Sequence, residues 1–512
     1  MARHLGEELL RWAAEKPDHD AVRFGARRWS WAQWADRVRR NAAAQLEAGL
    51  QPGDRVAFLD KNHPACLETT AGCALIGSVA ALLNFRLAAE EYVYLLNDSR
   101  ARLLIVGAEF AGVIDSISDR LEYLERVVVV SDDPALDQYE DWLVAARPAP
   151  GPVVGGPDDV VLQLYTSGTT GLPKGAMLTH RGVLAHSAAG AEAFGLDGES
   201  VSQVAMPLYH VGGTNWALIG LSVGGSVVID REVVPAVLLD EMDEFRITHT
   251  FIVPAVLGVI VGLPGLNERD FSSLRVVAYG SSPITPKVLE RCLVVLDAEF
   301  LGLYGMTETS GILTALPPEA HRDPENPHRL LSVGLPLPGV ELRVVDPATA
   351  ADVGIDQVGE VWVRSAQTLR GYHNKPEATA EALRADGWFR TGDAARRDAD
   401  GYLYITDRVK DMIISGGENV YPAEVERVLS GHPAVAEVAV VGAPDNRWGE
   451  VPIGYVVATG GDRPRESDLI EFARGRLAKF KCPAEIRFVD QLPRNPTGKV
   501  LKTELRKLVA DR

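Results

Sequence analysis

Short apolar, β-branched runs alternate with longer amphipathic segments along the first 330 residues of the chain. The short runs predict buried strands and the longer segments predict helices that bury one face. Strands are expected at Arg55–Leu59, Arg102–Val106, Arg126–Val130, Val160–Leu164, Ser226–Ile229, Thr248–Val253, Leu274–Tyr279 and Ala298–Leu303. Helices are expected at Ala32–Ala48, Ala236–Glu244 and Thr285–Val294. This alternation is typical of layered α/β structure with mostly parallel sheets.

The pattern changes after Gly334, where short strand-like pieces are separated by Gly and Asp turns. Three such pieces predict a small antiparallel unit: Val340–Val345, Glu360–Val363 and Tyr402–Ile405. A helix, two strands and another helix are then expected at Ala423–Leu429, Glu437–Val441, Gly454–Ala458 and Glu466–Ala478. We therefore predict an α/β fold with three parts. Residues 1–406 form a large domain of layered α/β subdomains plus the small antiparallel unit, 407–411 form a hinge, and 412–512 form a small mobile α+β domain.

Composition narrows the class of protein. A chain of 512 residues is too long for one core, so two or more domains are expected. The net charge of -18 argues against nucleic acid as a partner, although a local basic groove for a nucleotide is compatible with it. The cysteines Cys66, Cys73, Cys292 and Cys482 are scattered, which indicates neither a disulfide scaffold nor a metal site. The apolar stretch 69–83 is shorter than the roughly 20 residues of a membrane helix, and no signal peptide is visible, so we expect a cytoplasmic protein without an integral membrane segment.

The richest chemical segment is Tyr165–His180, which reads Tyr-Thr-Ser-Gly-Thr-Thr-Gly-Leu-Pro-Lys-Gly-Ala-Met-Leu-Thr-His. It follows an expected buried strand and offers backbone N–H groups, hydroxyls and one ammonium, the donors that bind a polyphosphate. It is not the usual P-loop, because Lys174 follows Pro173 and is not followed by Ser or Thr at the start of a helix. A plain surface turn is the structural alternative. The donor density favours a cradle for a nucleotide triphosphate.

Five further segments place polar groups where a purely structural explanation is strained: Pro207–Gly213, Tyr304–Glu308, Thr391–Asp393, Asp407–Asp411 and Pro493–Lys499. The Tyr304 segment follows an expected strand, and ligands bind at strand ends in α/β sheets. Each segment alone has an ordinary explanation. Asp393 could cap a turn, His210 could be a satisfied core histidine, and Lys499 could be a solvated lysine. Their joint occurrence in this order favours a functional interpretation.

Taken together and in order, these motifs resemble those of the ANL superfamily of adenylate-forming enzymes, specifically the acyl-CoA synthetases. The resemblance covers nearly the whole chain. It implies an AMP-forming acid–thiol ligase that uses ATP, Mg²⁺ and coenzyme A. A carboxylic acid and ATP would give acyl-AMP and pyrophosphate, and the CoA thiol would then attack the acyl-AMP.

The resemblance also implies residue roles. The catalytic groups would be Lys499 for adenylation, Lys174 on the phosphates, Thr307, Glu308 with Mg²⁺, and His210 as the aromatic gate. ATP would contact the loop, an adenine wall with two unusual hydroxyls, a stacking ring and two ribose ligands. These residues are Thr166, Ser167, Gly168, Thr169, Thr170, Gly171, Gly280, Ser281, Ser282, Tyr304, Gly305, Met306, Asp393 and Arg408. Lys410 matches the hinge, and Gly416 and Gly417 match the loop beside the CoA tunnel.

The acyl pocket is expected near His210, Val211, Gly212, Gly213, Thr214, Trp216 and Tyr279. Small residues leave room there, and no Lys, Arg or second His stands in these segments to hold a second carboxylate. This predicts a hydrophobic monocarboxylic acid, and similarity to bacterial fatty-acyl-CoA synthetases favours a medium or long fatty acid. Aryl or bulky polycyclic acids stay open as substrates.

The acyl acceptor and the extent of the reaction stay open as well. A stand-alone enzyme that loads a carrier protein, and one that performs a single half-reaction, both fit the motifs. A nucleotide-binding regulatory protein would leave Lys499 and the hinge without a role. The expected partners are the acid, ATP and CoA, and a homodimer is an open assembly state.

Overall fold

The computed structural model describes residues 4–148, 154–166, 172–282, 284–408, 411–415, 418–445, 447–460, 463–494 and 500–510. The chain divides into two compact units. The first comprises Met1–Glu341 and Arg364–Phe389, and the second comprises Leu342–Val363 and Arg390–Arg512. The hinge expected at 407–411 stays a prediction.

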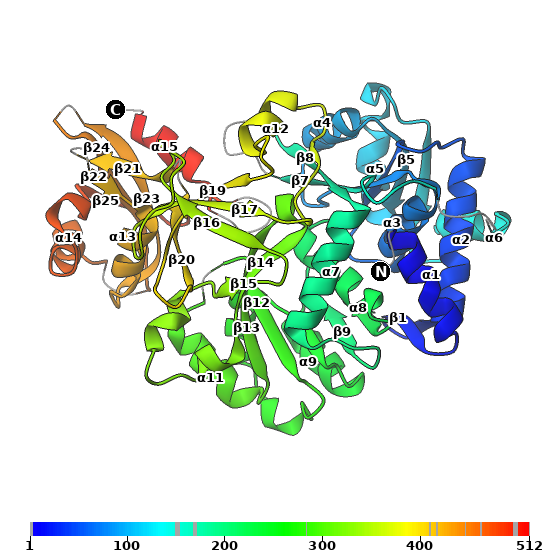
Figure 1. Ribbon diagram of the computed structural model, residues 1–512, viewed down its shortest axis with the longest axis horizontal. Helices are drawn as coiled ribbons and strands as arrows, with labels where there is room; N and C mark the ends of the chain where they lie inside the picture. The colour runs from blue at the N-terminus through cyan, green and yellow to red at the C-terminus, as the bar shows by residue number, and fades with distance from the viewer. Residues whose placement is uncertain are drawn as a thin grey trace. The chain divides into compact units, whose positions relative to one another are not determined.

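The first unit contains a nine-stranded sheet in the order β15-β14-β13-β12-β11-β9-β10-β1-β2 (Figure 1). Its central strands, from β13 to β1, pair in parallel, and β14, β15 and β2 are antiparallel additions at the edges. The strands are β1 (Asp20–Phe24), β2 (Arg27–Ser30), β9 (Val201–Val204), β10 (Ser226–Ile229), β11 (His249–Phe251), β12 (Val276–Gly280), β13 (Glu299–Met306), β14 (Gly311–Leu316) and β15 (Leu335–Pro336).

A seven-stranded sheet in the order β18-β8-β7-β4-β3-β5-β6 completes the sheets of this unit. The run from β7 to β6 is parallel, whereas β8 and β18 pair antiparallel at one edge. The strands are β3 (Arg55–Leu59), β4 (Val79–Leu82), β5 (Ala101–Gly107), β6 (Arg126–Val130), β7 (Val160–Thr166), β8 (Lys174–Thr179) and β18 (Gly371–Tyr372).

Helices cover these sheets in layers. α3 packs on β3, β4 and β7, α8 packs on β9 and β10, and α1 and α7 contact these helices. α4 and α5 share a core with β3 and β5, and α9, α10 and α11 share a core with the nine-stranded sheet. The helices are α1 (Leu5–Glu15), α2 (Trp31–Glu47), α3 (Pro64–Ile76), α4 (Ala89–Ser99), α5 (Ala108–Asp115), α6 (Gln138–Ala145), α7 (His180–Phe194), α8 (Val211–Ser222), α9 (Pro235–Glu244), α10 (Pro254–Ile260), α11 (Pro286–Val295) and α12 (Pro376–Ala382).

Alternation along β10 explains why this sheet is covered on both faces. Gly220 of α8 approaches Val227, whereas the neighbouring Val228 packs with the core of α9, α10 and α11. Successive side chains of a strand point to opposite faces, so the two helix groups lie on opposite sides of the sheet. Both faces of the nine-stranded sheet are therefore covered by helices and buried from solvent, as the continuous apolar runs predict.

The second unit has two sheets. A four-stranded sheet runs β16-β17-β19-β20, and a five-stranded sheet runs β22-β21-β24-β23 with β25 paired to β24. Helices α13 and α14 share one core with the five-stranded sheet, and Leu505 of α15 belongs to a second core. The elements are β16 (Glu341–Val345), β17 (Gly359–Arg364), β19 (Phe389–Arg397), β20 (Leu403–Arg408), β21 (Ile413–Ser415), β22 (Glu418–Val420), α13 (Pro422–Ser430), β23 (Val435–Asp445), β24 (Gly449–Ala458), α14 (Glu466–Arg474), β25 (Glu485–Phe488) and α15 (Lys502–Ala510).

The structure confirms the predicted α/β class, with its small antiparallel sheet and its α+β C-terminal part. The expected strands and helices are present, most of them with ends shifted by a few residues. The helix expected to Ala478 ends at Arg474, because Gly475 follows as its C-cap. The apolar stretch 69–83 belongs to buried α3 and β4. Among the helices of the described residues, none has the length and apolar character to cross a membrane.

Candidate functional site

The hydroxyl-rich loop lies between two antiparallel strands. β7 ends at Thr166, β8 begins at Lys174, and these two residues are Cα partners in the ladder. The loop therefore closes a β-hairpin, and Lys174 starts a strand, whereas the lysine of a P-loop leads into a helix. Five predicted loop residues lie outside the described residues: Ser167, Gly168, Thr169, Thr170 and Gly171.

Helix α4 holds both ends of this loop. The Tyr165 hydroxyl donates a 2.9 Å hydrogen bond to Asp98 Oδ2, and the Tyr94 hydroxyl donates a 2.9 Å bond to the Pro173 carbonyl. Burial and the nearby Asp98 carboxylate raise the pKa of Tyr165 far above its usual range, so its hydroxyl stays a neutral donor. Two anchors on one rigid helix fix the span across which the loop must close.

Glu308 lies on the short 3₁₀ turn Thr307–Thr309, directly after β13. It is only 8% exposed, and its Oε1 accepts a 3.0 Å hydrogen bond from the Tyr372 hydroxyl. Lys174 also contacts Tyr372, because its Nζ lies over the Tyr372 ring, 5.2 Å from the centroid. We call these three side chains the Lys174–Tyr372–Glu308 cluster. It brings the predicted phosphate lysine and the predicted metal carboxylate to one place.

The side chains of this cluster fit a Mg²⁺ ion that is bound partly by substrate phosphates. They do not form a site in which protein side chains supply all the metal ligands. Among the described residues, no group of three or more His, Cys, Asp or Glu side chains is arranged to hold a metal ion. Mg²⁺ commonly keeps several waters and is bound by one or two carboxylates together with substrate phosphates. A single buried carboxylate, Glu308, beside a phosphate-type lysine matches that pattern.

The predicted adenine wall and stacking ring lie at the carboxyl ends of two adjacent parallel strands. Gly280 ends β12 and pairs with Leu303 of β13, and Tyr304 is the next residue of β13. A Cβ on Gly280 would lie 2.6 Å from the Leu303 carbonyl oxygen, so a side chain has no room there. Ser281 follows with φ 66°, in the left-handed region, and Ser282 is exposed. Gly305 and Met306 complete the strand that leads to Glu308.

His210 is the N-cap of α8, and its Nδ1 accepts a 3.1 Å hydrogen bond from the Gly212 N–H. Burial lowers the pKa of His210, so the ring is held neutral as an acceptor. The turn before α8 is tight: a Cβ on Gly213 would lie 2.2 Å from the Pro207 carbonyl oxygen. The backbone shape around His210 therefore depends on glycine.

Asn62 clamps the strand-to-helix turn that carries His210. Its Nδ2 donates to the Met206 carbonyl at 3.0 Å, and its Oδ1 accepts from the Leu208 N–H at 2.7 Å. Asn62 follows β3 of the seven-stranded sheet, whereas Met206 and Leu208 follow β9 of the nine-stranded sheet. One amide thus ties together the carboxyl edges of the two sheets.

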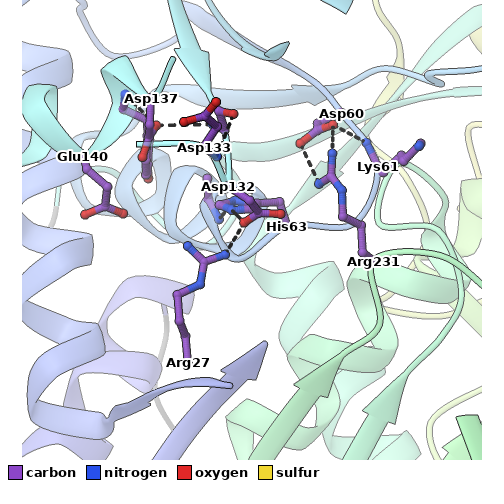
Figure 2. A network of polar contacts seen from close by, with 12 residues as sticks. Arg27, Asp60, Lys61, His63, Asp132, Asp133, Asp137, Glu140 and Arg231 are labelled. Carbon is purple, nitrogen blue, oxygen red and sulfur yellow. Dashed lines mark hydrogen bonds and ion pairs between the residues drawn. The ribbon is translucent and has the colours of Figure 1, made fainter. Parts of the chain in front are cut away.

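A polar network beside Asn62 makes the same connection (Figure 2). Arg231, which follows β10, makes two 3.1 Å hydrogen bonds to the carboxylate of Asp60, which follows β3. Asp60 is 5% exposed, and its burial raises its pKa although Arg231 opposes this shift. Nearby, Asp132 accepts from Arg27 at 2.5 Å and lies 3.8 Å from His63. These contacts fix the sheet edges from which the site residues project.

The remaining side chains of the predicted acyl pocket are packed in the interior. Thr214 is fully buried, and Trp216 is 3% exposed with its Nε1 donating to the Gln203 carbonyl at 2.9 Å. The Tyr279 hydroxyl lies 2.9 Å from His321 Nε2. Val211 is buried as well, which leaves His210 and Gly212 as the half-buried members of this predicted pocket. The lining of an acyl pocket by these residues stays a prediction.

In the second unit, the two predicted ribose ligands Asp393 and Arg408 are Cα partners on β19 and β20. Asp393 is 5% exposed, and its N–H donates to Thr391 Oγ1 at 3.0 Å. Thr391 in turn donates to the Val361 carbonyl at 2.8 Å. The side chain of Arg408 lies outside the described residues, as do Lys410, Gly416, Gly417 and Lys499.

Comparison with known proteins identifies the family. A family model described as AMP-binding enzyme matches residues 9–373, and one described as AMP-binding enzyme C-terminal domain matches residues 424–499. The chain belongs to the AMP-binding enzymes. It is an AMP-forming acid–thiol ligase of the adenylate-forming ANL superfamily, as the order of its motifs indicates.

Relatives of this AMP-binding enzyme match it over nearly their whole length. A fatty acid–[acyl-carrier-protein] ligase from Streptomyces coeruleorubidus is 41% identical over 96% of this chain and 94% of its own. A feruloyl-CoA synthase from an Amycolatopsis species is 39% identical over 98% of each chain. ATP-bound MatB from Rhodopseudomonas palustris has a similar structure, with a TM-score of 0.90 at 31% identity over 100% of this chain and 99% of its own.

Four residues of this AMP-binding enzyme were not predicted from the sequence: Tyr372, Asn62, and the two α4 residues that anchor the loop, Tyr94 and Asp98. Tyr372 lies in the short Gly-Tyr segment of β18, which carries no charge and has no strand-like pattern. One signal was available: Gly371 has φ 150°, so a glycine is favoured directly before that tyrosine. Asn62 follows the expected strand Arg55–Leu59, where ligand-binding and positioning groups of α/β sheets gather.

Proposed function

We propose that this enzyme activates a hydrophobic monocarboxylic acid with ATP and transfers the acyl group to the thiol of coenzyme A. The observation that carries the proposal is the Lys174–Tyr372–Glu308 cluster at the end of the hydroxyl-rich hairpin. A cation and a carboxylate placed beside a phosphate-type loop suit a Mg²⁺-bound triphosphate. They do not suit a protein-bound acyl intermediate, which would need a nucleophile with an adjacent base.

In the first step a carboxylate oxygen attacks the α-phosphorus of ATP, the bond to the β-phosphate breaks, and pyrophosphate leaves. Two anions must approach each other, so positive charge must offset their repulsion. Lys174 would hold the departing phosphates, and Lys499 would bridge the acid and the α-phosphate. Mg²⁺, held by Glu308, would supply further neutralising charge. Tyr304 would stack on adenine, while Asp393 and Arg408 would bind the ribose hydroxyls.

In the second step the thiol attacks the acyl-AMP and AMP leaves. Lys499 would have to withdraw, which we assign to a swing of residues 412–512 about Lys410 that presents Gly416 and Gly417. Lys499→Ala should abolish acyl-AMP formation and spare thioester formation from supplied acyl-AMP. Lys410→Pro should do the reverse. Equal loss of both half-reactions in the lysine variant would contradict this assignment.

A medium or long fatty acid is the proposed substrate, and a relative named as a fatty acid ligase supports it. The relative named as a feruloyl-CoA synthase, at nearly the same identity, supports the aryl alternative. A pyrophosphate-release screen over saturated fatty acids, cinnamates and polycyclic acids separates them. Turnover restricted to aryl acids would overturn the fatty acid proposal.

Transfer to a carrier protein is the second candidate, because the relative that matches at 41% identity is named for that acceptor. Acyl-AMP formed in the first step would be offered in parallel to CoA and to a phosphopantetheinylated carrier protein. We expect the CoA thioester to form faster. Formation of the acyl-carrier thioester alone would assign the enzyme to carrier-protein loading, and accumulation of acyl-AMP with both acceptors would assign it a single half-reaction. A cytoplasmic location and a homodimer remain proposals.

A further inference from the structure

Tyr372 is held in place independently of the two charged residues that it contacts. It pairs with Ala176 in the β18–β8 ladder, and its N–H donates to Thr379 Oγ1 at 2.9 Å. Gly371 before it adopts φ 150°, and a Cβ there would lie 2.8 Å from Thr379 Cγ2. The Tyr372 backbone is thus fixed by an edge strand and by α12, so the ring reaches the site from a rigid position.

Tyr372 contacts two groups of opposite charge, one at its hydroxyl and one over its ring. The Tyr372 hydroxyl donates to Glu308 Oε1 at 3.0 Å, and the Lys174 ammonium lies over its face, 5.2 Å from the centroid. Within the described part of the chain, the side chains of Lys174 and Glu308 both contact Tyr372. A lysine and a carboxylate that contact the same side chain attract each other, and a direct pair would consume the charges that a Mg²⁺-bound triphosphate needs.

We propose that Tyr372 is a positioning residue for adenylation. Its ring keeps Lys174 and Glu308 apart, and its hydroxyl orients the Glu308 carboxylate toward Mg²⁺. The ring face attracts the ammonium without carrying a negative charge, and the hydroxyl donates a hydrogen bond without carrying a positive charge. Both charges therefore stay available to the nucleotide. This inference rests on the proposed use of ATP and Mg²⁺.

The test compares Tyr372→Phe, which keeps the ring and loses the hydroxyl, with Tyr372→Leu, which loses both. Binding of α,β-methylene-ATP is measured by calorimetry with and without Mg²⁺. For Tyr372→Phe we expect the enhancement of affinity by Mg²⁺ to fall about three- to tenfold, as for the loss of one hydrogen bond, with affinity in the absence of Mg²⁺ unchanged. Tyr372→Leu should also weaken binding without Mg²⁺, because Lys174 is then free to pair with Glu308.

Glu308→Gln and the double variant with Tyr372→Phe show whether the hydroxyl acts through Glu308. In the Glu308→Gln background, Tyr372→Phe should have no further effect on the Mg²⁺ dependence. Tyr404→Phe is the matched control, because Tyr404 also donates to a carboxylate, Asp398 Oδ2, at 2.9 Å in the second unit. It should leave the Mg²⁺ dependence unchanged.

Three results would overturn the inference: an unchanged Mg²⁺ dependence in Tyr372→Phe, an equal loss of affinity with and without Mg²⁺, or an undiminished effect in the Glu308→Gln background. The proposed function fails separately, if wild-type enzyme releases no pyrophosphate with any acid. Wild-type enzyme that binds the analogue equally well with and without Mg²⁺ would overturn both.

Discussion

The Lys174–Tyr372–Glu308 cluster and the turn around His210 are built in different ways. The cluster joins side chains from β8, β18 and the turn after β13 through a hydrogen bond and a cation–ring contact. The His210 turn is shaped by its backbone, because Gly213 has no room for a Cβ and Asn62 clamps the chain through main-chain groups. The first region is held together by contacts of charged side chains with one tyrosine, and the second by the shape of its backbone.

This difference predicts different sensitivities to mutation. Replacing a charged side chain of the cluster should change catalysis and leave folding intact, since Lys174 is half-buried and makes no ion pair among the described residues. Replacing a glycine or a buried group near His210 should change stability first, because its neighbours are packed. Single substitutions can separate these effects on catalysis from those on stability.

Lys174→Ala should reduce pyrophosphate release by about 10²–10³-fold, because the proposed contact of its ammonium with the leaving phosphates would be lost. The free energy of unfolding should change by less than about 1 kcal/mol, the size of an exposed cation–ring contact. The measurement pairs steady-state pyrophosphate release with urea denaturation. Lys507→Ala, at a lysine that is 70% exposed and pairs with Glu504, is the control and should change neither. If Lys174→Ala lowered the free energy of unfolding by as much as it raised the activation free energy, the Lys174–Tyr372–Glu308 cluster would not differ from the His210 turn in its sensitivity to mutation.

Gly213→Ala should destabilise the enzyme by about 1–3 kcal/mol or prevent folding, because a Cβ would meet the Pro207 carbonyl oxygen at 2.2 Å. The matched control is Gly112→Ala in α5, where no atom lies within 4 Å of the added Cβ. This variant should gain about 0.5–1 kcal/mol from helix propensity. Thermal and urea denaturation measure both. Equal stability of the two variants would show that the turn before α8 can relax.

The buried His321 near Tyr279 should make stability depend on pH. Its Nδ1 lies 2.9 Å from the Pro317 carbonyl, and burial lowers its pKa to about 4, against about 6.5 in an unfolded chain. Between these values the unfolded state binds a proton that the folded state does not. The free energy of unfolding should therefore fall by up to about 1.4 kcal/mol per pH unit as pH drops from 6.5 to 4. His321→Gln should show a shallower fall in urea denaturation, and parallel curves for the two proteins would contradict the assignment.

His210→Ala should cost about 1 kcal/mol of stability, because the N-cap acceptor of α8 is lost. His210→Asn, which restores a cap, should recover that stability. If His210 also gates the acid, both variants should raise the KM for the acid while the KM for ATP stays constant. If the His210→Asn variant had a normal KM for the acid, His210 would act only as the N-cap of α8 and not as a gate for the acid.

Much of the fold could be predicted, because many buried strands are short runs of apolar, β-branched residues that are visible in the local sequence. Arg55–Leu59, Arg126–Val130 and Ser226–Ile229 have the predicted bounds. The antiparallel edge strands were missed, since β8 follows a loop of turn residues and β18 is a two-residue element. A strand defined mainly by its partner leaves little local pattern to detect.

The candidate site also has a part that could be predicted from the sequence and a part that could not. The order of its motifs was enough to assign the family, because the six segments together resemble those of the adenylate-forming enzymes. The anchors Tyr94, Asp98 and Asn62 were missed, because their roles depend on contacts with distant backbone groups.

The residue types that this chemistry requires can be read along the chain: a hydroxyl-rich loop with one lysine, a carboxylate after a strand, and an order of motifs that resembles the adenylate-forming family. Which side chains meet depends on the folded structure. Lys174 lies over the ring of Tyr372 and Glu308 accepts a hydrogen bond from its hydroxyl, and that tyrosine comes from a segment without any motif. The physical reason is that residue types follow from the reaction, whereas their spacing depends on strand pairing between segments far apart in the chain.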